Sequence, residues 1–261
     1  MKRWLLVLTC LLSIKASASL LAEPTKFEYI LDPLAKTTGA IKVTNITSTP
    51  LLITAKAYDW ILKEDGSLEN LPLGNHQTTL AGNLKFNPKQ FNLAPGQTQI
   101  VRFTVTMPDQ PPKERRTMVF FETEEITLTG GIKTIMQTQI GTVIYVTASK
   151  TKASFQMLEI KEAIRDYQLN FYLLCLNSGE IHIRMSLTYA ILDLFGQELF
   201  KNTIEDNVLL PEQKLVLKLP IEKNIQPGIY KIVGKFTFDG THTFLPFVYS
   251  FTIDNTIEGG L

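Results

Sequence analysis

Apolar and polar residues alternate along most of this 261-residue chain, and turn-forming residues interrupt the alternation at short intervals. The segment 99–105 is typical, because it alternates and lies between Pro95-Gly96 and Pro108. Alternation with a period of two residues places one face of a β-strand against a core, and many short strands separated by Gly, Pro and Asn are typical of a sandwich or barrel. The segment 155–165 could also form a helix, but its flanks have the pattern of strands. The sequence therefore predicts an all-β fold.

The predicted strands fall into two series. A short polar stretch, Thr-Ala-Ser-Lys-Thr-Lys at 147–152, follows one long strand-like run and precedes the second series. Each half has the length and the approximate number of strands of an immunoglobulin-like sandwich. We therefore expect two tandem immunoglobulin-like β-sandwich domains, at 19–149 and 150–261.

The first 18 residues have the three parts of a secretory signal peptide. Met1-Lys2-Arg3 is a charged start, residues 4–12 are an apolar run, and Ala16-Ser17-Ala18 has the small-x-small form of a cleavage site. This run is too short to be a membrane anchor, because a spanning helix needs about 20 apolar residues. No later segment approaches that length. We expect residues 1–18 to be a signal peptide and the rest to be exported without insertion into the membrane.

Net charge argues against a nucleic-acid-binding protein, and the cysteine count argues against a disulfide-stabilised one. The chain has 26 Lys and Arg against 25 Asp and Glu, and a nearly neutral chain lacks the basic patch that nucleic acids require. Export would permit disulfides, but only Cys175 follows the predicted signal peptide. It lies in the apolar run 171–176, which indicates a buried and inert thiol.

The sequence offers no convergent set of catalytic groups. The three histidines, His76, His182 and His242, lie in distant segments without metal-ligand spacing. There is no Gly-x-Ser-x-Gly motif and no phosphate-binding glycine loop. We expect the acidic run at 122–125 to be a solvated strand edge. A hydrolase would require a pocket where His182 or His242 meets a carboxylate. We therefore expect a binding protein rather than an enzyme, with no metal and no cofactor.

Several segments resemble the PapD-like periplasmic pilus chaperones. Residues 87–103, Asn-Pro-Lys-Gln-Phe-Asn-Leu-Ala-Pro-Gly-Gln-Thr-Gln-Ile-Val-Arg-Phe, resemble the "P…L.PG…..VR" stretch of that family. Residues 112–121 look like its "P.DRES.F.." strand, and 136–140 are similar to the long last strand of its first domain. In the second half, 177–184 and 226–230 resemble divergent members. The resemblance covers nearly the whole chain after residue 18.

This resemblance implies a boomerang of two immunoglobulin-like domains that acts in the periplasm. Such a protein holds secreted fimbrial or pilin-like subunits before assembly, with an outer-membrane usher as a further partner, and needs no cofactor. Its long last strand completes the unfinished sheet of the subunit by β-strand addition. An alternative is a cell-envelope scaffold protein that uses the same sandwiches without chaperone action.

The strand expected to bind the subunit is 132–146. Its donor face would carry Ile132, Thr134, Met136, Thr138 and Ile140, because alternate side chains share a face. The alternative is an ordinary sandwich strand that is paired internally on both edges.

The resemblance also implies a pair of cations that grip the carboxylate at the end of the subunit. In the family one is an Arg on the first strand and the other a Lys on the last strand, and the Lys position falls near Gly141 here. Lys26, at the edge of the first predicted strand, and Lys133 are the candidates left for this role. Arg116 occupies the place of an acid that forms an interdomain ion pair in the family, so this pair is not expected.

Overall fold

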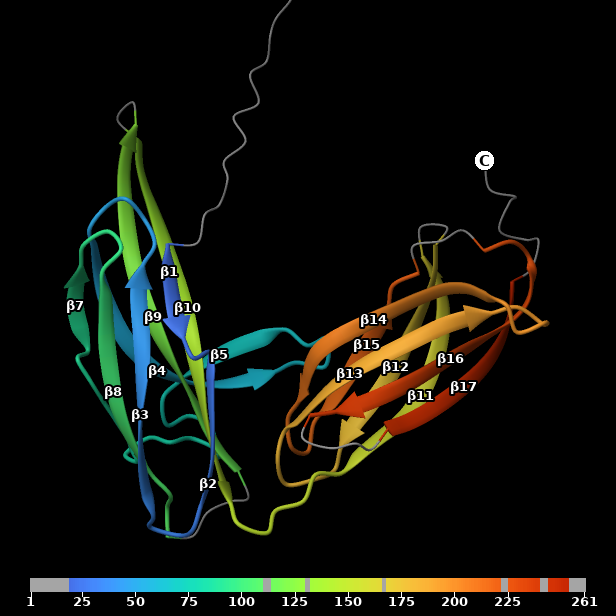
Figure 1. Cartoon of the computed structure of the whole chain (residues 1–261), viewed down its shortest axis with the longest axis horizontal. Coiled ribbons are helices and arrows are strands. Elements are labelled where there is room, and N and C mark those ends of the chain that lie inside the picture. The colour runs from blue at the N-terminus through green and yellow to red at the C-terminus, as the bar shows by residue number, and fades with distance from the viewer. Residues whose placement is uncertain are drawn as a thin grey trace, which may run out of the picture.

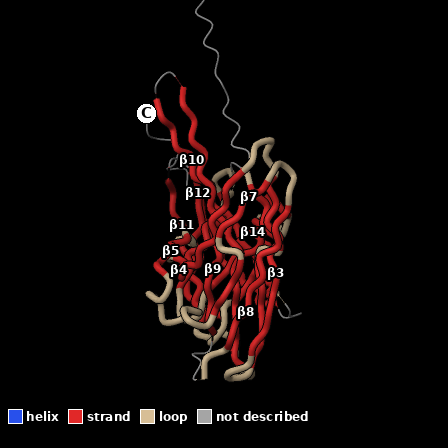
Figure 2. The backbone as a smooth tube through the Cα atoms, turned by 90° about the vertical axis from the view of Figure 1, so that its left-hand side faces the viewer, coloured by secondary structure: helices blue, strands red, loops and turns tan. Residues whose placement is uncertain are grey.

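The computed structural model describes residues 19–109, 114–129, 132–165, 168–221, 225–239 and 244–253. For residues 124–129, 132–137, 164–165, 168 and 244 it describes the backbone alone. The predicted signal peptide and His242 lie outside the described residues. All regular elements in the described part are β-strands (Figure 2), and no helix there is long and apolar enough to cross a membrane. The expected all-β fold is confirmed.

The first ten strands form two sheets. One has the order β1-β3-β8-β6, and the other has the order β2-β10-β9-β4-β5, with β7 paired to β4. Their bounds are β1 (Leu20–Glu23), β2 (Lys26–Leu31), β3 (Lys36–Asn45), β4 (Leu51–Leu62), β5 (Leu68–Pro72), β6 (Leu84–Asn87), β7 (Gln90–Leu93), β8 (Thr98–Thr106), β9 (Glu114–Thr129) and β10 (Ile132–Ala148).

The remaining seven strands form two further sheets, with the orders β11-β12-β15 and β14-β13-β16-β17. Their bounds are β11 (Phe155–Arg165), β12 (Gln168–Asn177), β13 (Ile183–Leu192), β14 (Glu198–Leu209), β15 (Lys214–Leu219), β16 (Gly228–Phe238) and β17 (Phe244–Ile253). The segment 155–165 is thus a strand, as its flanks suggested.

Each pair of sheets encloses its own apolar core. The first core includes Ile41, Phe103 and Phe121, and the second includes Phe171, Tyr189 and Phe236. Alternation explains both, because in strands such as β13 every second side chain is buried. The structure is therefore two immunoglobulin-like sandwiches, which meet at an angle (Figure 1).

Each sandwich contains one buried asparagine at the end of a strand, and the two side chains make the same pattern of hydrogen bonds. Asn45 is the last residue of β3 and Asn177 the last of β12, and both side chains are fully buried. Each amide group donates to two backbone carbonyls and accepts from the backbone N–H two residues further on, at 2.7–3.1 Å. These bonds satisfy the polar groups where the chain leaves the sheet, and buried groups must be satisfied in this way.

The edge of the first sandwich is shared between two short strands. β1 pairs with β3 in one sheet, and after Pro24-Thr25 the chain continues as β2, which pairs with β10 in the other sheet. Because β1 pairs with β3 and β2 pairs with β10 only from Val143 to Ala148, residues 132–142 of β10 have no paired strand on that edge. The β9–β10 hairpin extends beyond the other strands (Figure 1).

Candidate functional site

Strand β10 is paired along one edge and only partly along the other. It pairs antiparallel with β9 from Ile132, opposite Thr129, to Thr147, opposite Glu114. On its other edge it pairs in parallel with β2 only from Val143 to Ala148. Within the described residues, positions 132–142 have no strand paired with them on that second edge.

The N–H groups that face this open edge can be assigned from the register. Val143 N–H donates to Thr25 O on the β2 side, at 3.0 Å. Successive N–H groups of a strand point to opposite edges, and the β9–β10 register runs without a shift. The N–H groups of Ile135, Gln137, Gln139 and Gly141 therefore point to the open edge, whereas those of the even-numbered residues point to β9.

The expected donor face of β10 continues the core face of the first sandwich. Thr142, Ile144 and Val146 are buried, and Ile140 is partly buried against the same core. The Thr138 side chain is likewise partly buried. The other three expected donor residues have a described backbone only, which lies opposite β9 residues: Ile132 opposite Thr129, Thr134 opposite Thr127 and Met136 opposite Glu125.

The opposite face of β10 is covered by other side chains at Gly141, the position where the resemblance places a lysine. A Cβ atom added at Gly141 would lie 2.7 Å from Met118 Sδ and 2.9 Å from a ring carbon of Phe120. Both side chains belong to an apolar cluster that also contains Trp60. Neither a lysine nor any other side chain fits here without displacing the cluster, which explains the glycine.

The two candidate anchors, Lys26 and Lys133, lie near opposite ends of β10. Lys26 is paired with Val143, where the open edge meets β2, and its side chain is 41% exposed. Lys133 is paired with Leu128 near the other end. At about 3.3 Å per residue the two positions are roughly 33 Å apart along the strand, so they cannot hold the same carboxylate.

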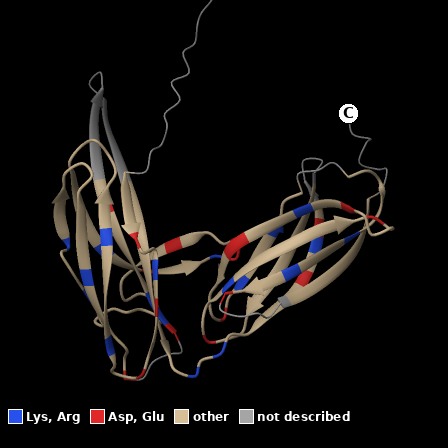
Figure 3. Cartoon of the chain, in the orientation of Figure 1, with Lys and Arg blue, Asp and Glu red and all other residues tan. Residues whose placement is uncertain are grey.

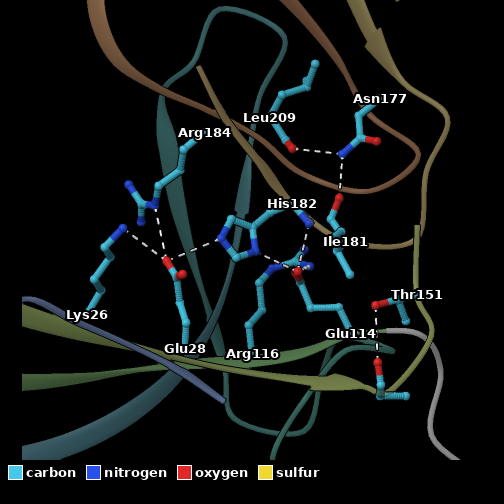
Figure 4. Close-up of polar contacts among 11 residues, drawn as sticks. Lys26, Glu28, Glu114, Arg116, Thr151, Asn177, Ile181, His182, Arg184 and Leu209 are labelled. Atoms are coloured by element: carbon cyan, nitrogen blue, oxygen red, sulfur yellow. Dashed lines mark hydrogen bonds and ion pairs between the residues drawn. The ribbon is translucent and has the colours of Figure 1, made fainter. Parts of the chain in front are cut away.

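A buried carboxylate connects the two sandwiches (Figure 4). Glu114, on β9, accepts hydrogen bonds at Oε2 from the backbone N–H of His182 at 2.8 Å, and the same oxygen lies 2.6 Å from His182 Nδ1. Its other oxygen lies 3.4 Å from the buried guanidinium of Arg116. Burial lowers the pKa of Arg116, and the negative charge of Glu114 opposes this effect. Arg116 thus pairs within its own sandwich, and the contact with the second sandwich comes instead from Glu114, which accepts the hydrogen bond of the His182 backbone N–H.

A second carboxylate, that of Glu28 on β2, faces the same histidine from the cleft between the sandwiches. Its Oε1 lies 3.1 Å from Lys26 Nζ, 3.6 Å from His182 Nε2 and 3.5 Å from Arg184 Nε. Burial raises the pKa of Glu28, but Lys26, His182 and Arg184 outweigh it and hold the pKa below its ordinary value. Charged residues gather where the sandwiches approach each other (Figure 3).

Apolar and backbone contacts complete the junction. Trp60 and Tyr145 of the first sandwich form one cluster with Leu210 of the second, and Tyr145 stacks on the His182 ring at 3.9 Å between centroids. The turn of the β4–β5 hairpin reaches the second sandwich, where Glu64 O accepts a 2.7 Å hydrogen bond from Val216 N–H, on β15. A cleft of about 450 Å³ remains beside the junction, lined in part by Tyr29, His182 and Arg184.

This arrangement supports a structural role for His182. The ring does meet a carboxylate, as a hydrolase would require, but Glu114 contacts Nδ1 and Glu28 faces Nε2. A catalytic histidine keeps one nitrogen for the nucleophile, and both nitrogens are directed at carboxylates here. His76 is hydrogen-bonded to Thr78 in a turn. In the described part of the chain, no three His, Cys, Asp or Glu residues are grouped so as to hold a metal.

Cys175 is completely buried in the second core. Burial raises the pKa of its thiol to about 12, so it is protonated and unreactive near neutral pH. The acidic run differs from expectation, because Glu122 is buried and accepts hydrogen bonds from Lys56, Tyr58 and Gln139.

Two immunoglobulin-like sandwiches set at an angle, with a long, half-open strand ending the first, define the PapD-like chaperone fold. The structure matches that of the class 5 fimbriae chaperone CfaA with a TM-score of 0.50 and 14% sequence identity, over 88% of this chain and 98% of that chain. At this identity the match establishes the fold.

Two complexes give similar matches. A chain of the Salmonella enterica SafA pilin–SafB chaperone complex has a TM-score of 0.47 and 15% identity, over 90% of this chain and 97% of that chain. A chain of the CsuC–CsuE chaperone–tip subunit complex from Acinetobacter baumannii has a TM-score of 0.46 and 14% identity, over 88% and 98%. No model of a known protein family matches the sequence, and no curated protein matches it.

Proposed function

We propose that this protein is a periplasmic chaperone that caps fimbrial or pilin-like subunits by β-strand addition from β10. The observation that carries the proposal is the open edge of residues 132–142 beside a fully paired edge on β9. A long unpaired edge invites another strand to pair with it. The fold match to a fimbriae chaperone supports the same function.

The recognition would combine two kinds of contact. Outward N–H and C=O groups of β10 would continue the sheet into the subunit, independently of its side chains. The face that contains the partly buried Ile140 would fill the groove left by the strand that the subunit lacks. Ile132, Thr134, Met136 and Thr138 would extend this face. No cofactor takes part.

Lys26 would hold the carboxylate at the end of the subunit strand. β2 runs parallel to β10 on the open edge, and Lys26 is its first residue. A subunit strand lying on the same edge in the same direction would end just before Lys26. Its carboxylate would then lie beside an exposed ammonium group, and an ion pair at such a strand end fixes the register. Lys133, at the far end, would contact another part of the subunit.

The proposal also covers how the protein reaches the periplasm and what receives its complex. Residues 1–18 would direct export and be removed, leaving the two sandwiches in the periplasm without insertion into the membrane. An outer-membrane usher would receive the complex and release the chaperone as the subunits assemble.

The experiment is capture of a subunit by the tagged chain lacking residues 1–18, exported with a replacement leader and co-expressed with fimbrial-type subunits. We expect a soluble one-to-one complex. Gln137→Pro should abolish it, because proline removes an N–H at the open edge and leaves the ladder to β9 intact. Gln137→Ala, which keeps the N–H, is the matched control. Equal complex formation by both variants would contradict strand addition.

A further inference from the structure

One carboxylate oxygen at the junction faces the nitrogen atoms of three side chains. Glu28 Oε1 lies 3.1 Å from Lys26 Nζ, 3.5 Å from Arg184 Nε and 3.6 Å from His182 Nε2 (Figure 4). Charge-assisted hydrogen bonds are usually about 2.7–2.9 Å. All three distances are longer, so Glu28 makes no optimal bond to any one of the three groups.

The three groups differ in what else holds them. His182 is fixed by Glu114 through Nδ1 and its backbone N–H. Arg184 donates to Asp206 at 3.0 Å, and its Nε is buried without a hydrogen bond in the described structure. Lys26 belongs to the first sandwich, like Glu28, whereas the other two groups belong to the second. The Lys26 contact therefore draws Glu28 toward its own sandwich, and the other two draw it across the cleft.

We propose that Glu28 couples the occupation of Lys26 by a client carboxylate to the tightness of the junction between the two sandwiches. This inference rests on the proposed function of Lys26 as the anchor. A client carboxylate that binds the Lys26 ammonium group replaces Glu28 in this ion pair. The Glu28 carboxylate can then form shorter hydrogen bonds to Arg184 Nε and His182 Nε2. The coupling is reciprocal, since a tighter junction also leaves Lys26 free for the client.

The consequence is a chaperone that senses the end of its client. A client strand with a free carboxylate tightens the junction, whereas a strand that pairs with β10 but stops short of Lys26 does not. Glu28 acts here as a positioning residue, because it touches the anchor and the junction but not the client.

The test uses Lys26→Met to imitate a neutralised anchor, so no client is needed. The readouts are the NMR signal of the Arg184 Nε–H group and quenching by acrylamide of Trp60 fluorescence. Trp60 is buried at the junction and is the only tryptophan in a chain lacking residues 1–18, since the other is Trp4. Lys85→Met, at an exposed lysine of β6, is the matched control.

We expect Lys26→Met to move the Arg184 signal downfield and to slow quenching of Trp60, and Lys85→Met to change neither. In a Glu28→Gln background, Lys26→Met should lose both effects. Equal behaviour of the two lysine variants, or persistence of the effects without Glu28, would overturn the coupling. These measurements contain no client, so they test the coupling separately from the proposed function. The coupling can be contradicted while the capture experiment with Gln137→Pro supports strand addition, and strand addition can be contradicted while the coupling is supported.

Discussion

The carboxylate of Glu114 and the imidazole of His182 join the two sandwiches, with 2.6 Å between Oε2 and Nδ1. The contact is nearly excluded from water, because the Glu114 side chain is 1% exposed and the His182 side chain 11%. The same carboxylate neutralises Arg116, whose side chain is 3% exposed. Glu114 therefore fixes the second sandwich and compensates a buried charge in the first.

Glu114→Ala should destabilise the protein strongly. It removes the carboxylate that is paired with the buried guanidinium of Arg116, and breaking a buried pair in this way typically costs about 3–5 kcal/mol. Urea unfolding followed by circular dichroism measures the loss. Glu69→Ala removes the half-exposed pair with Lys63 and should cost less than about 1 kcal/mol. Similar losses for the two variants would show that Glu114 has no special role.

Gly141→Ala should reduce the free energy of unfolding by about 1–3 kcal/mol, the usual effect of overpacking. The new methyl group would press on Met118 and Phe120. A second substitution, Met118→Ala, should recover part of the loss when combined with Gly141→Ala, because it makes room for the methyl group. Urea unfolding of the two single variants and the double variant measures this. A fully additive double variant would contradict the contact.

Acid should weaken the contact between β9 and β10 through Glu122. Burial raises the pKa of this carboxyl, but hydrogen bonds from Lys56 and Gln139 outweigh burial and lower the pKa below its ordinary 4.5. A depressed folded-state pKa contributes stability that is present above 4.5 and is lost as the pH falls through the lower folded value. Urea midpoints measured from pH 7 down to pH 3 should therefore decline less in Glu122→Gln than in the parent protein. Parallel declines would contradict the assignment.

The thiol of Cys175 should not react with a disulfide reagent in the native protein. It is fully buried, and burial raises its pKa to about 12. One thiol should be titrated in a chain lacking residues 1–18 once urea unfolds the second sandwich. Stoichiometric labelling of the native protein within minutes would contradict this burial.

Some strands could be predicted from the sequence and others could not, for physical reasons. The predicted strand 132–146 matches β10, which ends only two residues later, because its alternation is long and one face enters a core. β14 is difficult to predict from the sequence, since it is a sheet-edge strand with many exposed polar residues and its alternation is weak. β5, β6 and β7 have only four or five residues each, too few for a periodic pattern.

The junction could not be predicted at all. Glu28, Glu114 and His182 are widely separated in the sequence, and no motif connects them. Their meeting depends on the angle between the sandwiches, which the Trp60 cluster and the Glu64–Val216 hydrogen bond help to fix. One sequence signal was informative. The resemblance places a lysine near Gly141, and the glycine there is explained by Met118 and Phe120, which leave no room for a side chain.

Backbone hydrogen exchange along β10 tests strand addition most directly. In the free protein, the outward N–H groups of Ile135, Gln137 and Gln139 should exchange much faster than the inward ones of Met136, Thr138 and Ile140, which bond to β9. When a subunit binds, the three fast groups should become protected and the three slow groups should stay unchanged. Protection of Gln137 and Gln139 already in the free protein, or no change on binding, would contradict the account.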